Sequence, residues 1–158
     1  MIVPVPGFDT TVRLAIQRAF IDGRPTPSVA TVAAELRARA SDVASAFDRL
    51  AAGHVIVLAP DTHDIVMSAP FAGRPTNFAV TIGTSLYHAN CVWDALGVAA
   101  MLAGAGQRVD AEVRTSCADC GAPVTVHVRG GAVSADPVSS VAHFAVPAAR
   151  WWTDIVFT

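Results

Sequence analysis

The sequence predicts an α+β protein in two parts: a winged-helix-like part over residues 1–70, and an antiparallel sheet packed with a central helix over residues 71–158. Three observations lead to this prediction. Apolar residues recur at helical spacing through the first fifty residues. Two short apolar segments around a polar turn follow, as in a β-hairpin. Towards the C-terminal end the pattern changes to the apolar–polar alternation of antiparallel strands.

Three helices are predicted in the first part from their start and stop signals. Asp9 or Thr10 can cap the first helix, which ends at the Gly and Pro residues of "DGRPTP". Ser28 can cap a second helix and Ser41 a third. The segments "HVIVLAP" and "DIVMSAP" then predict two short strands. Three helices followed by a hairpin form the winged-helix pattern.

The second part is predicted to combine one apolar helix with several strands. Residues 71–77 are interpreted as a linker, followed by a strand in "FAVTIG". Residues 89–103 are helical in pattern and nearly all apolar, so we expect this helix to be central and buried. The segments "RVDAEVRT", "VTVHVRG" and "VSSVAHFAV" are predicted to be strands.

Composition and charge argue against several classes of function. The net charge of −2 at pH 7 argues against a general nucleic-acid binder. Residues 1–70 carry six arginines and seven acidic residues, which argues against DNA as a partner of the winged helix. A packing module is the plainer interpretation. No apolar run reaches the length of a membrane span. The start lacks the pattern of a secretory signal, and we expect a cytoplasmic protein. The oligomeric state is not indicated.

The first candidate site is Cys91 with Asp94, in "YHANCVWDALG". Residues three apart share one face of a helix, so both side chains are expected to point into the same volume. In the first turn of a helix the free N–H groups lower the pKa of a thiol. Burial raises the pKa of a carboxyl group, which then keeps its proton. Such a pair could bind a soft electrophile and deliver a proton. The alternative is a structural cysteine beside an aspartate that bonds backbone or arginine.

The second candidate site is the C-x-x-C motif of Cys117 and Cys120. Two thiols in a tight turn can hold a soft metal, such as mercury, zinc or copper. Cys91 could complete a three-cysteine site if the fold brings it close, and so could one of His88, His127 and His143. A redox pair and a structural cysteine are the alternatives. Three cysteines in a cytosolic chain argue against a disulfide framework.

Residues 85–130 resemble the organomercurial (alkylmercury) lyases. "YHANCVWDALGVAAMLAG" and, about twenty residues later, "TSCADCGAPVTVHV" match that family in order and spacing. The resemblance implies cleavage of a carbon–mercury bond by protonolysis, without a required cofactor. It assigns mercury capture to Cys91, proton donation to Asp94 and a structural role to Cys117. The implied partner is a small organomercurial or a thiol-bound metal.

The chain departs from the family at the second catalytic cysteine. Ser139 and Ser140 stand where that cysteine is expected, before His143 and Phe144. A serine hydroxyl is a hard ligand and cannot replace a thiolate on mercury. Cys120 is additional to the family pattern and could supply the missing thiol if its turn folds toward Cys91.

Three functions therefore compete. The first is a compact organomercurial lyase that uses Cys91, Asp94 and, if it lies close enough, Cys120. The second is a non-lyase homologue that binds soft metals or thiols through Cys91, Cys117 and Cys120. The third is a regulatory protein that retains the winged helix. Release of hydrocarbon, metal binding without turnover and DNA binding, respectively, distinguish them.

Overall fold

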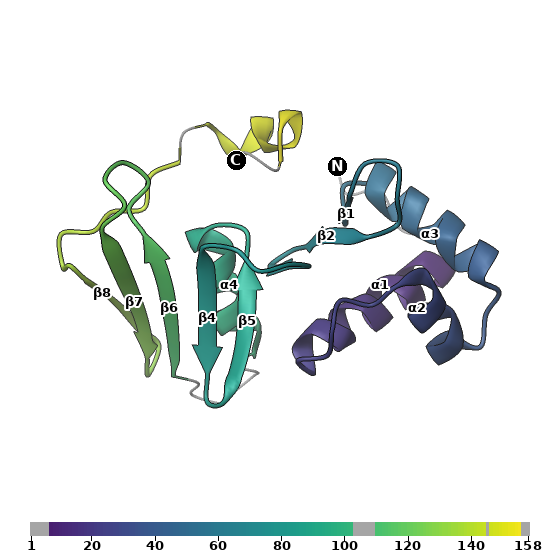
Figure 1. Cartoon of the computed structure of the whole chain (residues 1–158), viewed down its shortest axis with the longest axis horizontal. Coiled ribbons are helices and arrows are strands. Elements are labelled where there is room, and N and C mark those ends of the chain that lie inside the picture. Colours follow the sequence, from purple (N-terminus) through teal and green to yellow (C-terminus); the bar gives the residue numbers. More distant parts are fainter. Residues whose placement is uncertain (1–6, 103–109, 145, 156–158) are drawn as a thin grey trace. The chain divides into compact units, whose positions relative to one another are not determined.

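The protein divides into two compact units, Met1–Ala69 and Pro70–Thr158 (Figure 1). The structure, a computed structural model, describes residues 7–102, 110–144 and 146–155. Parts of three predicted elements lie outside the described residues: Ala103 at the end of the helix, residues 108–109 at the start of one strand, and Ala145 within another. No helix in the described ranges is both long and apolar enough to cross a membrane.

The first unit contains the three helices and the hairpin that the sequence predicts. The helices are α1 (Gly7–Ile21), α2 (Val29–Leu36) and α3 (Ala40–Ala52). Strands β1 (Val57–Leu58) and β2 (Ile65–Ser68) pair antiparallel. The core side chains come from all three helices and the hairpin segment: Val12, Ile16, Phe20, Val32, Val43, Phe47, Leu50 and Ile56. These elements are confirmed, while their identification as a winged helix stays a prediction.

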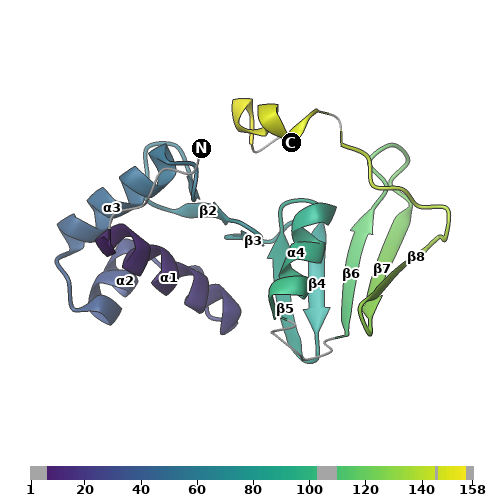
Figure 2. The ribbon, with the colours of Figure 1, turned by 180° about the vertical axis from the view of Figure 1, so that it is seen from behind.

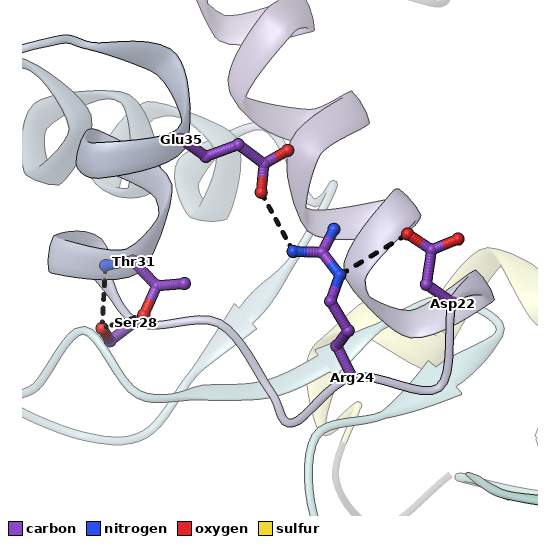
Figure 3. Close-up of polar contacts among 5 residues, drawn as sticks. All are labelled: Asp22, Arg24, Ser28, Thr31 and Glu35. Atoms are coloured by element: carbon purple, nitrogen blue, oxygen red, sulfur yellow. Dashed lines mark hydrogen bonds and ion pairs between the residues drawn. The ribbon is translucent and has the colours of Figure 1, made fainter.

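A side-chain cap lies at the start of α2, and two ion pairs of the preceding loop lie near this helix (Figure 3). Ser28 is the N-cap, and its Oγ accepts a hydrogen bond from the Thr31 backbone N–H at 3.2 Å, as predicted. Arg24, in the preceding loop, reaches Glu35 at 3.1 Å and Asp22 at 3.5 Å. These ion pairs are at least partly exposed, so the cap contributes more to fixing the helix start than they do.

Two other helix starts differ from the prediction. Helix α1 begins at Gly7, so Asp9 lies in its first turn and instead binds Arg49 of α3, at 2.7 and 2.9 Å. Helix α3 begins at Ala40 after Arg39, whose guanidinium binds Asp42. Ser41 therefore lies inside the helix and is not its cap.

The second unit is an antiparallel sheet in the order β3-β5-β4-β6-β7-β8. Its strands are β3 (Phe71–Ala72), β4 (Phe78–Ile82), β5 (Ser85–Ala89), β6 (Ala111–Ser116), β7 (Pro123–Arg129) and β8 (Ala132–Asp136). A 3₁₀ helix, η1 (Ala148–Thr153), follows. The predicted linker at residues 71–77 is wrong at its start, because Phe71 is buried and pairs with Ala89 of β5.

Helix α4 (Val92–Leu102) covers one face of this sheet, in front of β4 and β5 in the view from behind (Figure 2). On the helix itself, Ala95, Val98 and Ala99 are buried, whereas Trp93 and Met101 are exposed. The predicted central helix is therefore confirmed, but only one of its faces is buried. It begins at Val92 rather than at Ala89, which is the last residue of β5.

The last predicted strand is displaced. Gly130 and Gly131 have positive φ values of 58° and 84°, so the chain reverses there and pairs with β7 at once. The strand that results is Ala132–Asp136, and Pro137, which has no N–H group to donate, follows it. In the predicted segment "VSSVAHFAV" the structure has no strand among the described residues 138–144 and 146, and Val138 and Val141 are exposed.

Candidate active site

Cys91 and Asp94 lie at the junction between strand β5 and helix α4. Strand β5 is fixed by its pairing with β4 up to Ala89, and Cys91 directly precedes the helix. The Cys91 carbonyl accepts the Ala95 N–H at 2.9 Å, and the Cys91 Sγ accepts the Asp94 N–H at 3.4 Å. The cysteine therefore caps α4 with its own sulfur, which fixes the position of the thiol.

The two side chains also contact each other, as the spacing predicts. The Cys91 thiol and the Asp94 carboxyl group lie close enough to shift each other's pKa. Asn90 donates from Nδ2 to the Asp94 Oδ2 at 3.3 Å. Sequence reasoning missed Asn90, although its position four residues before Asp94 is the spacing at which helical side chains meet. All three residues are partly buried.

Partial burial decides the protonation of both groups. It raises the pKa of Asp94 above its ordinary value, against the opposing hydrogen bonds from Asn90 and Cys91. Burial also raises the pKa of Cys91, and the Asp94 carboxylate adds to that effect. The prediction of a lowered Cys91 pKa is wrong, because the N–H groups of Asp94 and Trp93 do not outweigh the loss of water. Burial therefore raises the affinity of both groups for a proton.

Cys117 and Cys120 lie together in the turn between β6 and β7. The Cys117 N–H bonds the Ala122 carbonyl at 2.8 Å, and the Gly121 N–H bonds the Cys117 carbonyl at 2.9 Å. The nearby backbone N–H group of Cys120, then that of Asp119 and the Cys120 thiol, favour the thiolate of Cys117 and so lower its pKa. Cys117 is partly buried and Cys120 is exposed.

The three cysteines do not form the single site that the sequence suggested. Cys91 interacts with Asp94, and Cys120 with Cys117. No three His, Cys, Asp or Glu side chains among the described residues form a group that could hold a metal ion. Cys91, Cys117 and Cys120 are therefore not brought together as one ligand set.

The segment that carries the two serines is a turn after β8. Ser139 is exposed, and the Ser140 Oγ donates to the Pro137 carbonyl at 2.7 Å. His143 is exposed. His127 is partly buried, and its Nδ1 lies 3.8 Å from Glu112.

Trp93, the residue before Asp94, takes part in aromatic contacts that the sequence did not reveal. Trp93 packs edge-on against Phe144, with ring centroids 6.2 Å apart, and Phe144 stacks on Trp151 at 5.8 Å. The Trp151 Nε1 donates to the Val146 carbonyl at 3.0 Å. This aromatic group joins the start of α4 to the C-terminal segment around η1.

Comparisons with known proteins bear on this site. The model of the alkylmercury lyase family, MerB, matches residues 71–158, which is more than half of the chain. A solved structure described as the mercury-bound form of MerB2 has the same fold, with a TM-score of 0.68 and 23% sequence identity. The similarity covers 85% of this chain and 63% of that one. No curated protein matched the chain.

Proposed function

Because this chain belongs to the alkylmercury lyase family, we propose that it cleaves carbon–mercury bonds by protonolysis, with Cys91 binding mercury and Asp94 protonating carbon. The observation that carries the proposal is that Cys91 and Asp94 share the start of α4, where the Asp94 N–H bonds the Cys91 Sγ at 3.4 Å. It joins a soft metal ligand to a proton carrier at one helix start. The reaction needs no organic cofactor.

In the capture step, the Cys91 sulfur displaces a small thiolate from the organomercurial. The Cys91 S–H bond breaks, a sulfur–mercury bond forms, and the proton moves to the neighbouring Asp94 carboxylate. The small thiolate leaves with its electron pair. The raised pKa values support this step, because the thiol carries a proton and the carboxyl group accepts it readily.

In the cleavage step, Asp94 returns that proton to the carbon bound to mercury. The carbon–mercury bond breaks and its electron pair forms the new carbon–hydrogen bond, so a hydrocarbon leaves. A small thiolate that bound mercury before the cleavage remains on the metal beside Cys91, and Asp94 is again a carboxylate. Mercury remains in the +2 state throughout. The hydrogen bond from Asn90 supports the orientation of Asp94.

The second sulfur on mercury is proposed to come from a small thiol in solution. Ser139 and Ser140 offer only hydroxyl groups, and Cys120 interacts with Cys117. An incoming monothiol supplies the soft donor that increases electron density on carbon. Turnover should therefore depend steeply on the concentration of added thiol.

The first unit is assigned, as part of this proposal, to a winged-helix-like packing module. Its three helices precede a two-stranded hairpin, which supports the assignment. Its balance of six arginines and seven acidic residues over residues 1–70 supports packing rather than DNA binding.

The test is hydrocarbon release from an arylmercurial in the presence of excess monothiol. Wild type should release the arene, and Cys91→Ser should abolish release because serine does not bind mercury. Asp94→Asn should lower the rate by about 10² to 10⁴, since that is the usual contribution of general acid catalysis. It should still bind the organomercurial, which mass spectrometry of the adduct can measure. Binding by wild type without any release would replace the lyase with a soft-metal-binding homologue.

A further inference from the structure

The Cys117–Cys120 turn holds two thiols that the proposed cleavage does not use. The turn is closed by the hydrogen bonds between Cys117 and Ala122 and between Gly121 and Cys117. This closed turn brings Cys120 back toward Cys117, close enough for the Cys120 thiol to act on the Cys117 thiol. Cys120 is also open to solvent.

The number of ligands decides which metal this turn fits. Zinc in structural sites takes four ligands, and no group of three His, Cys, Asp or Glu exists among the described residues. The remaining residues of the chain contain none of these four types. Two thiolates alone suit a soft ion that prefers linear two-coordination, which mercury(II) does.

We propose that Cys117 and Cys120 form a second, two-coordinate mercury(II) site that accepts the inorganic product of carbon–mercury cleavage. The choice of mercury as the ion rests on the proposed function, whereas the capacity of the turn to chelate a soft ion does not. The site is distinct from Cys91, which makes its contacts with Asp94.

The transfer is a ligand exchange without oxidation or reduction. Mercury(II) arrives bound to two small thiolates. Each protein thiol forms a sulfur–mercury bond, and its proton leaves on one of the released small thiols. Mercury stays in the +2 state, and the exchange yields the chelate and two free thiols. The protein binds mercury more tightly than two separate thiols do, because the second sulfur lies in the same turn and binds as part of a chelate.

The experiment uses the full chain in the Cys91→Ser background, which removes the first mercury ligand. Mercuric ion is added with a small monothiol in excess, and the mercury retained is measured by native mass spectrometry. We expect one mercury per Cys91→Ser chain. Adding Cys120→Ser should weaken retention at least about 10²-fold, because the chelate is lost. Asp119→Ala in the same background is the matched control, since it keeps both thiols and the backbone N–H groups, and it should retain mercury.

Three results would overturn the proposal: no mercury on Cys91→Ser, equal retention without Cys120, or an intact mass that shows a Cys117–Cys120 disulfide instead of a mercury adduct. Cys117→Ser is a second test, and circular dichroism shows whether it folds. If it does not, the exposed Cys120 decides alone. Absence of arene release by wild type would remove the lyase but not this site, because the retention assay does not involve cleavage.

Discussion

Burial of Asp94 has two consequences: it favours the proposed proton transfer, and it lowers the stability of the folded protein when the carboxyl group is ionised. The partly buried carboxyl group has a raised pKa, which suits a residue that must hold and release a proton. The same burial makes its ionised form unfavourable in the folded protein. The proposed catalytic role and the stability of the fold therefore place opposite demands on this residue, and a substitution can separate them.

Asp94→Asn should be more stable than wild type at neutral pH. The folded carboxyl group has a pKa above its ordinary value of 3.8, so wild type loses stability as pH rises from that value through the raised one. Asparagine does not ionise and escapes this loss. Urea denaturation across a pH series should show the stability gap closing in acid. A gap that is constant with pH would contradict the account.

At this scale the sequence predicted the Cys91–Asp94 contact but not its electrostatics. A spacing of three residues places Cys91 and Asp94 on one helix face, and this placement can be predicted without the tertiary structure. The direction of the Cys91 pKa depends on how much water the rest of the fold removes, which no local pattern reports. The aromatic contact of Trp93 with Phe144 joins residues far apart in the sequence, and it was missed for the same reason.

At the scale of elements, caps and turns determine where helices and strands begin. Ser28 was recognised because its side chain bonds a backbone N–H within three residues. Ser41 was not a cap, because α3 starts one residue earlier beside the Arg39–Asp42 ion pair. Strand β8 was misplaced because the glycine turn brings the chain back against β7 at Ala132. Local signals thus predict that an element exists better than where it ends.

Ser28→Ala should destabilise the first unit by about 1 kcal/mol, the usual effect of losing an N-cap side chain. The Thr31 N–H would lose its acceptor at the start of α2. The denaturation midpoint measures the change. Ser41→Ala is the matched control and should have a smaller effect, because Ser41 lies inside α3. Equal effects of the two substitutions would contradict the assignment of the cap.

Gly97→Val should destabilise the second unit by about 1–3 kcal/mol, as overpacking does. A Cβ at Gly97 would lie 3.2 Å from the Pro70 Cβ, and the branched side chain of valine adds atoms beyond it. Gly97→Ala should be tolerated better, because alanine favours the helix and needs only a small shift of Pro70. Thermal denaturation compares the two, and a valine variant as stable as the alanine variant would rule out the close contact.

At the scale of the whole molecule, each unit has its own charges and core. Arg49→Ala should destabilise the first unit by about 1–3 kcal/mol, because Asp9, only 2% exposed, would lose its partner. Arg49 lowers the pKa of Asp9, so the stabilisation is present above the unfolded pKa and is lost as pH falls through the folded one. Chemical denaturation of both proteins at neutral and acid pH measures this.

Arene release by Arg49→Ala, measured below its unfolding temperature, should remain close to that of wild type. The proposed chemistry lies entirely in the second unit, at Cys91 and Asp94. A large loss of release in a folded Arg49→Ala protein would show that the first unit takes part in the reaction.

The aromatic group of Trp93, Phe144 and Trp151 also gives the protein a built-in optical reporter. All three tryptophans, Trp93, Trp151 and Trp152, belong to the second unit, so intrinsic fluorescence follows that unit alone. Far-ultraviolet dichroism will be dominated by α1, α2 and α3 of the first unit. Mercury quenches indole emission as a heavy atom, and Trp93 lies next to Asp94 in the chain. Loading of Cys91 can therefore be followed in real time without any label.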